Sequence, residues 1–155
     1  MKRFLPCILV VLFVLGSATA ATCQEKVTMS GRHVWHTLET LSHQVGEGQS
    51  AECYKRAGVG FINETGEVYT ITNMYCLYYF GNNIVGGGVA STQSEQGGTV
   101  SIFHMNTKDN KRIFRWLSGT GKYQGISGEG TFEAQMVGEG MGYTDWRGEY
   151  TLTPK

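Results

Sequence analysis

Proline and net charge are both scarce in this sequence. The chain has two prolines in 155 residues, Pro6 and Pro154, and its 13 Lys and Arg balance its 13 Asp and Glu. Only 17% of the residues are charged. Without a positive excess, the chain has no basic surface to attract nucleic acid or acidic lipid. We therefore expect no nucleic-acid partner.

The sequence also lacks the motifs that mark nucleotide binding, hydrolysis and metal binding. Residues 119–130 are rich in glycine, but they do not fit a P-loop, because Tyr123 stands where that loop needs Ser or Thr. Their glycine spacing does not fit the dinucleotide fingerprint either. No Gly-x-Ser-x-Gly nucleophile elbow is present. The local spacing of the histidines gives no metal site; they are His33, His36, His43 and His104. We expect no nucleotide, cofactor or metal.

One long apolar run is present, and it lies at the N-terminus. Lys2 and Arg3 precede the apolar residues 4–16, and small residues follow, which is the order of a secretory signal peptide. The run is shorter than the roughly 20 residues that a membrane-spanning helix needs. We expect residues 1–20 to be a cleaved signal peptide and residues 21–155 to be one exported domain, periplasmic or secreted, with no integral membrane segment. Without Lys2 and Arg3, 11 basic residues remain against 13 acidic ones, a formal charge of −2.

Glycine and aromatic residues are abundant instead. Of the 22 glycines, 21 follow residue 20, together with 16 aromatic residues. Distributed glycines with few prolines are typical of strands joined by tight turns, and the aromatic side chains favour burial. We predict an all-β fold with eight strands, at residues 27–45, 52–62, 67–80, 84–92, 99–105, 111–119, 131–137 and 145–153.

Two of the predicted strands have unusual sequences. In the first, Leu38, Leu41 and Val45 lie three and four residues apart, as on one face of a helix. The glycine-rich surroundings favour a long, bent strand over that helix. In another, residues 86–88 are three consecutive glycines, which indicate a bulge, a sharp barrel corner or a close approach to the backbone.

Side-chain alternation in the later segments separates an apolar face from a polar one. In the last two segments, one set of alternate residues is mostly apolar or aromatic, and the residues between them include Thr, Glu, Gln, Asp and Arg. Eight strands with one buried face, and no helix to cover a second, form a small barrel or a sandwich. The residues of the apolar parity are Phe114, Trp116, Phe132, Ala134, Met136, Trp146, Tyr150 and Leu152.

A hairpin turn after Ile62 would bring two cysteines together. If the loop has four residues, Ile62 faces Glu67, and counting back along both strands places Cys53 opposite Cys76. Cysteines that meet in an exported protein are expected to oxidise. We predict a disulfide between Cys53 and Cys76, which leaves Cys23 as a free thiol or as part of an intermolecular bond.

The glycine-rich segment also carries a family resemblance. Residues 119–132, Gly-Thr-Gly-Lys-Tyr-Gln-Gly-Ile-Ser-Gly-Glu-Gly-Thr-Phe, resemble a segment of the allene oxide cyclase and dirigent barrel superfamily. Residues 146–152, Trp-Arg-Gly-Glu-Tyr-Thr-Leu, resemble the closing strand of such barrels, and the similarity covers residues 113–153. It implies an eight-stranded, antiparallel, calycin-like β-barrel with a central cavity. The superfamily includes cyclases, isomerases, coupling-directing proteins without a catalytic centre, and exported bacterial proteins of unknown role. No catalytic residue of the plant members can be matched to this chain.

Aromatic side chains are the candidates for a binding site. They could line an apolar pocket or fill the barrel, since eight strands leave room for side chains or for one small ligand. We expect a filled core with a shallow mouth. The candidate ligand-binding residues are Trp35, Tyr75, Tyr78 and Trp116.

The candidate acids and bases are Glu39, Glu52 and His104. Either carboxylate would serve as a general acid or base only if barrel closure placed it inside, and otherwise it is a solvated side chain. His104 shares its parity with Val100 and Ile102, which allows an inward side chain. A lone inward histidine is more often a hydrogen-bonded core residue than a ligand.

These observations favour a non-enzymatic exported barrel that binds a small apolar or aromatic molecule in its mouth. One alternative is a cyclase or isomerase that controls the conformation of a ligand in an apolar cavity. Another is a purely structural or partner-binding barrel, which could associate through its outer strands into an oligomer. A cavity that holds one titratable group would favour the cyclase or isomerase, whereas a filled core would favour the structural barrel.

Overall fold

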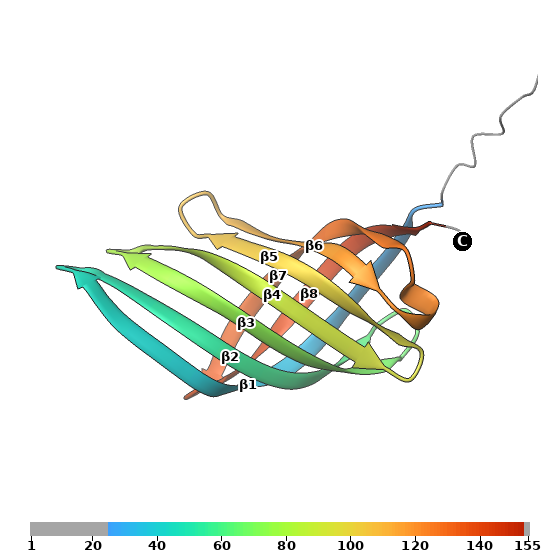
Figure 1. Cartoon of the computed structure of the whole chain (residues 1–155), viewed down its shortest axis with the longest axis horizontal. Helices are drawn as coiled ribbons and strands as arrows, with labels where there is room; N and C mark the ends of the chain where they lie inside the picture. The colour runs from blue at the N-terminus through green and yellow to red at the C-terminus, as the bar shows by residue number, and fades with distance from the viewer. Residues whose placement is uncertain (1–24, 154–155) are drawn as a thin grey trace, which may run out of the picture.

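The computed structural model describes residues 25–153, which form a closed barrel of eight antiparallel strands (Figure 1). The predicted fold class is confirmed, and β8 pairs with β1 to close the wall. The expected signal peptide, residues 1–20, and Cys23 lie outside the described residues. Within residues 25–153, no helix has the length and apolar character to cross a membrane. The strands are β1 (Val27–Gly46), β2 (Gln49–Ile62), β3 (Val68–Phe80), β4 (Asn83–Ser94), β5 (Gly97–Asn106), β6 (Lys111–Gly119), β7 (Ile126–Gly138) and β8 (Met141–Leu152).

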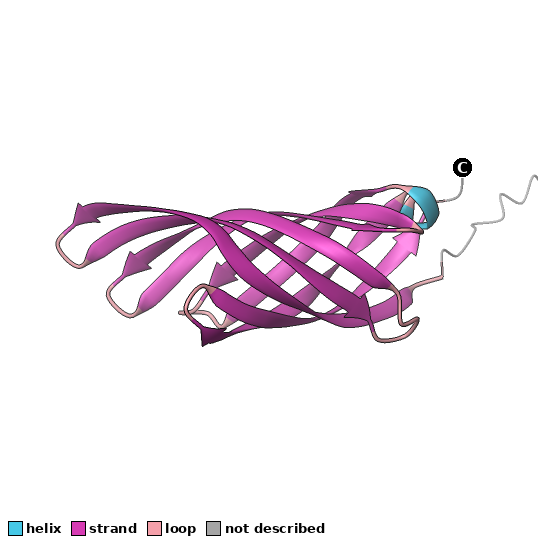
Figure 2. Cartoon of the chain, turned by 90° about the horizontal axis from the view of Figure 1, so that it is seen from below, coloured by secondary structure: helices cyan, strands magenta, loops and turns pink. Residues whose placement is uncertain are grey.

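The first strand is long and bent. β1 is one strand of 20 residues, so the helical alternative for this segment is wrong. A register shift between Thr37 and Glu39 marks a bulge, which bends a strand and increases its twist. Up to His36, β1 pairs with both β2 and β8, whereas beyond Thr37 its ladder continues with β2 alone. The β1–β2 hairpin therefore extends past β8 at one end of the barrel (Figure 2).

The turn after Ile62 has the predicted register. The backbone N–H of Ile62 donates a hydrogen bond to the carbonyl of Glu67 at 2.9 Å. Along the same ladder Cys53 lies opposite Cys76, and a disulfide joins the two residues. The structure thus contains the disulfide that the hairpin register predicts.

Residues 119–132 form the end of β6, a tight turn and the start of β7, as the glycine pattern predicts. A short 3-10 turn, η1 (Gly121–Tyr123), lies over one end of the barrel and buries Tyr123 (Figure 1). Gly121 and Gly125 have φ angles of +59° and +76°, which residues with a side chain rarely adopt. Glycine is therefore required for the turn that covers this end.

Other glycines lie inside the strands, where neighbouring backbones come close. A Cβ atom at Gly88 would lie 2.0 Å from the carbonyl oxygen of Met74, and the β3–β4 ladder runs through Gly88 without a register shift. Of the three interpretations of residues 86–88, a close approach is the one found. Paired glycines also extend the last two strands, which begin at Ile126 and Met141 rather than at the predicted 131 and 145.

The predicted parity of the later strands is confirmed. Phe114, Trp116, Phe132 and Trp146 all line the barrel interior, and Tyr150 packs against the buried core. One face of the wall is therefore apolar and internal, as the alternation requires. Two positions near the strand ends depart from the pattern, since Gln135 also lines the cavity and Leu152 is exposed.

Candidate ligand-binding cavity

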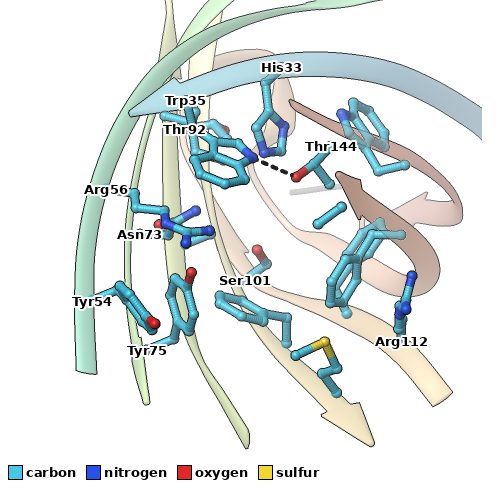
Figure 3. A pocket seen from close by; sticks show the side chains of 18 of the residues that line it. His33, Trp35, Tyr54, Arg56, Asn73, Tyr75, Thr92, Ser101, Arg112 and Thr144 are labelled. Atoms are coloured by element: carbon cyan, nitrogen blue, oxygen red, sulfur yellow. Dashed lines mark hydrogen bonds between the residues drawn. The ribbon is translucent and has the colours of Figure 1, made fainter. Parts of the chain in front are cut away.

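The barrel encloses a cavity of about 750 Å³, lined by residues from all eight strands (Figure 3). The expectation of a filled core with a shallow mouth is therefore wrong. The reason is that several aromatic rings lie along the wall over inward glycines instead of across the barrel, such as Trp146 over Gly31, Tyr69 over Gly60 and Trp116 over Gly148. A cavity of this volume is within the range of sites that hold small molecules. Glycines at the inward positions of the strands include Gly31, Gly58, Gly60, Gly86, Gly88, Gly130, Gly142 and Gly148.

The cavity is covered at one end and open at the other. Tyr123 of η1 and Ile126 of β7 cover the first end, where they are 5% and 3% exposed. At the far end, Ala134, Met136 and Glu139 line the cavity and are also exposed to solvent. A ligand would enter through this second end.

Glu67 is buried at the covered end among polar partners. Its carboxylate pairs with the ammonium of Lys122 and accepts hydrogen bonds from the hydroxyls of Ser94 and Tyr123, the latter at 2.9 Å. Burial alone would raise the pKa of this carboxyl group, but the hydrogen bonds from Lys122, Ser94 and Tyr123 outweigh burial and hold the pKa below its usual value. Glu67 is therefore ionised, and the ammonium of Lys122 balances its charge. These contacts connect η1 to the β2–β3 turn.

Aromatic rings form much of the wall. Phe114 and Trp116 meet edge to face with their centroids 4.8 Å apart, and Trp116 contacts Trp146 and Tyr150 at 6.4 and 5.8 Å in the same manner. This is the geometry that ring quadrupoles favour. All three tryptophans of the chain line the cavity, Trp35 being the third. Their fluorescence can therefore report what the cavity contains.

His33 and Tyr69 form a hydrogen-bonded pair in the cavity wall. The indole N–H of Trp146 donates to the Tyr69 hydroxyl at 2.7 Å, and that hydroxyl lies 3.3 Å from Nδ1 of His33. The tautomer of the neutral His33 ring sets which of the two atoms donates in this contact. Burial lowers the pKa of His33 to about 4 and raises the pKa of Tyr69 to about 12. Both side chains are uncharged near neutral pH.

Arg56 lines the cavity between aromatic rings. Its guanidinium carbon is 3.7 Å from the ring centroid of Trp35, 4.9 Å from that of Tyr54 and 5.0 Å from that of Tyr75. Nε donates a hydrogen bond to Oγ1 of Thr37 at 3.2 Å. Burial lowers the pKa of Arg56, although an arginine stays charged at any ordinary pH. Figure 3 shows the guanidinium facing the interior between Trp35 and Tyr75.

Asn73 lies beside Arg56 and has an unpaired acceptor. The two residues are directly opposite each other in the β2–β3 ladder, and both line the cavity. Oδ1 of Asn73 is the one buried side-chain nitrogen or oxygen among residues 25–153 without a hydrogen-bond partner. A buried acceptor without a partner costs free energy, which a bound donor would recover.

Three of the four predicted ligand-binding residues line this cavity. Trp35, Tyr75 and Trp116 are lining residues. Figure 3 shows Trp35, whose indole N–H donates a hydrogen bond to Thr144 at 3.0 Å. Tyr78 does not line the cavity and is 47% exposed. On β3 the inward positions are the odd-numbered ones, such as Tyr75, so Tyr78 points outward.

The predicted acids and bases do not meet in the cavity. Glu39 is exposed and pairs with Lys55 at 3.2 Å on the outer surface, beyond the β1 bulge. His104 is exposed on the outer face of β5, because the inward parity of that strand belongs to Phe103 and its alternate neighbours. Glu52 accepts a hydrogen bond from the Tyr54 hydroxyl near the open end. Among residues 25–153, no group of three His, Cys, Asp or Glu converges as metal ligands would.

The sequence patterns indicated Tyr69 only as one of the β3 tyrosines that could line a pocket and His33 only as a histidine without a metal site, and they did not indicate Arg56 or Asn73. The signal that could have found them is parity, applied to the earlier strands as it was to the later ones. Arg56 shares the inward parity of Ile62 on β2, and Tyr69 and Asn73 share that of Tyr75 on β3. An inward arginine without an acidic neighbour is the most informative of these.

The fold and the cavity together define a small closed β-barrel with room for a ligand. A crystal structure of a protein of unknown function of the DUF3224 family, from Shewanella oneidensis MR-1, has a similar fold, with a TM-score of 0.56. The two sequences are 14% identical, and the superposition covers 84% of this chain and 99% of that one. The likeness shows the fold alone. No family pattern and no curated protein matches the sequence.

Proposed function

We propose that this barrel is a binding protein whose central cavity takes one small apolar or aromatic molecule. The observation that carries this proposal is the cavity itself, with about 750 Å³ of space and a largely aromatic wall. Burial of an apolar ligand contributes roughly 25 cal/mol for each Å² removed from water. The open end beside Ala134 and Met136 supplies the entrance.

A cyclase or isomerase is the second candidate, and His33 and Tyr69 are the observation in its favour. They are titratable groups in an aromatic cavity, in hydrogen-bond contact at 3.3 Å. General acid–base catalysis works best when the pKa of the group lies near the working pH. With a pKa of about 4, His33 is a weak base, and with a pKa of about 12, Tyr69 is a weak acid. These values favour binding over catalysis.

We extend the proposal to the family relationship of the protein and to its location. Relationship to the allene oxide cyclase and dirigent superfamily is supported by the motif at residues 119–132 and by the closed antiparallel barrel of eight strands. Export is supported by the order of basic, apolar and small residues in 1–20. The Cys53–Cys76 disulfide agrees with it, since such bonds persist in oxidising compartments.

Native mass spectrometry of the protein purified from its own host tests the binding proposal. We expect a retained small molecule that is released when the protein unfolds. The same protein with the cavity filled by Ala90→Phe should carry none. A protein that retains nothing across several independent preparations would count against the proposed function.

A further inference from the structure

We propose that the ligand of this cavity is an organic anion, a carboxylate on an aromatic or apolar body, and that Arg56 binds the carboxylate. This inference rests on the proposed function and names the chemical class of its ligand. It follows from the position of Arg56, whose hydrogen-bond donors are mostly unused.

Arg56 has five N–H donors, and the protein uses one of them. Nε donates to Thr37, whereas the two terminal NH₂ groups have no acceptor among residues 25–153. No carboxylate pairs with Arg56 either, because the ion pairs of these residues use Lys26, Arg32, Lys55 and Lys122. A half-buried guanidinium without a counter-ion costs free energy. A ligand anion would supply both the counter-ion and the acceptors for the two terminal NH₂ groups.

The aromatic rings hold the guanidinium in place without using its donors. Trp35 lies against the guanidinium plane at 3.7 Å, and Tyr54 and Tyr75 flank it at 4.9 and 5.0 Å. Contacts with ring faces leave the N–H edges free to point elsewhere. A guanidinium presents these edges as a planar fork that matches the two oxygens of a carboxylate. Arg56 is therefore oriented in advance for a bidentate contact.

Asn73 offers the ligand a second polar contact beside Arg56. Its Oδ1 is buried without a partner, and the residue faces Arg56 across the β2–β3 ladder. A ligand with a hydroxyl or N–H group near its carboxylate would satisfy both residues at once. Ala90 lies directly opposite Asn73 on β4, and the small polar side chains of Thr92 and Ser101 also line the cavity near this point.

The charges elsewhere in the cavity agree with an anionic ligand. Glu67 is neutralised by Lys122 at the covered end, so it does not attract a cation. Arg112 is a second positive side chain in the wall, on β6 (Figure 3). Glu52 contacts the Tyr54 hydroxyl rather than Arg56. Glu139 lines the cavity at the open end, where it is exposed, so the lining cations without an ion pair among residues 25–153 are Arg56 and Arg112, and these attract an anion.

A matched pair of probes tests the inference. Naphthoic acid and naphthamide have the same ring system, but at pH 8 the acid is an anion and the amide is neutral. Quenching of the intrinsic tryptophan fluorescence gives the affinity of each. We expect the wild-type protein to bind naphthoate at least about tenfold more tightly than naphthamide, as a charge-assisted hydrogen-bonded pair implies.

The variant Arg56→Gln separates the anion site from the cavity. It should lose about tenfold to a hundredfold in naphthoate affinity while naphthamide affinity changes by less than about threefold. The control is Arg115→Gln, which removes one positive charge from the exposed outer face of β6 and should change neither affinity. Retained naphthamide binding also verifies that the Arg56 variant is folded.

The outcomes distinguish this inference from the proposed function. Equal affinity of the wild-type protein for both probes would overturn the anionic ligand and leave the apolar cavity in place. A preference for naphthoate that persists in Arg56→Gln would overturn the role of Arg56. Failure of both probes to give saturable quenching would contradict the proposed function as well. The wild-type comparison requires no variant, so it stands even if Arg56→Gln does not fold.

Discussion

Cys53 and Cys76 lie directly opposite each other on β2 and β3, and a disulfide joins them across the hairpin. The same ladder places Arg56 opposite Asn73 further along the two strands. A one-residue slip would turn every side chain of β2 to the other face. The disulfide therefore fixes the register that directs Arg56 and Asn73 into the cavity.

Removal of this disulfide should destabilise the barrel. The bond joins residues 23 apart in the sequence, and in the chain-entropy estimate a loop of that size contributes about 3 kcal/mol. We expect the double variant Cys53→Ser/Cys76→Ser to lose about 2–4 kcal/mol in urea denaturation. Wild-type protein under reducing conditions should unfold at the same urea concentration as the variant. An unchanged unfolding midpoint in both cases would contradict a stabilising role.

Glu67 should stabilise the covered end in its charged form. Its folded-state pKa is lowered, so its contribution is present above the ordinary glutamate pKa of about 4.3 and disappears as the pH falls through the folded value. We expect Glu67→Gln to cost roughly 2 kcal/mol at pH 7, discounted for the partly exposed Lys122. The difference from wild type should shrink in acid.

Glu47→Gln serves as the control for this prediction. Glu47 is exposed in the turn between β1 and β2, so its replacement should leave the free energy of unfolding nearly unchanged at pH 7. Chemical denaturation at several pH values below 7 checks both variants. If Glu67→Gln tracks Glu47→Gln at pH 7, the network around Glu67 does not stabilise the fold.

His33 should make the protein less stable in mild acid. Its pKa of about 4 in the folded state is lower than the usual value of about 6.5, so protonation favours the unfolded chain. The contribution of the neutral His33 to the free energy of unfolding is fully present above pH 6.5, and it decreases as the pH falls towards 4. Between pH 7 and pH 5 the loss should be about 2 kcal/mol. Glu67 contributes little to this window, because it titrates at lower pH.

The variant His33→Gln should remove most of this loss, since glutamine does not titrate. His104→Gln is the matched control, because His104 is exposed on the outer face of β5. Its stability should fall between pH 7 and pH 5 as in the wild type. Urea denaturation at pH 7, 6 and 5 distinguishes the two. A similar loss in His33→Gln and in wild type would contradict the buried, neutral imidazole.

Occupation of the cavity by a side chain should block ligand binding. Ala90 is buried in the wall beside Asn73, and Ala90→Phe would place a ring in the empty space. We expect naphthamide and naphthoate affinities to fall by at least about tenfold, with little loss of stability because the ring fills a void. Ser91→Phe puts the same ring on the exposed outer face of β4 and should bind both probes normally. Normal binding by Ala90→Phe would place the ligand elsewhere.

Much of the fold could be predicted from local sequence. The alternation of Phe132, Ala134 and Met136 identified the inner face of β7, and the distance from Ile62 to Glu67 fixed the hairpin register. The start of β7 could not be predicted, because Gly128 pairs within a strand although glycine usually marks a turn. Only long-range pairing with Tyr150 decides between these roles.

The site could be predicted less well than the fold. Trp35, Tyr75 and Trp116 were identified because large aromatic residues favour the interior. The empty space inside the barrel could not be identified from the sequence. It depends on which glycines point inward once the eight strands close into a barrel. The importance of Arg56 depends on the absence of a nearby carboxylate, and that absence is a property of the closed barrel. Composition alone does not reveal it.

The most direct test of a ligand-binding cavity is a crystal structure of the protein soaked with bromonaphthamide, with anomalous diffraction recorded at the bromine edge. The account predicts one strong bromine peak inside the barrel, within contact distance of the cavity-lining rings such as Trp116 and Phe103. A barrel interior without a bromine peak, at a probe concentration that saturates the outer surface, would contradict it.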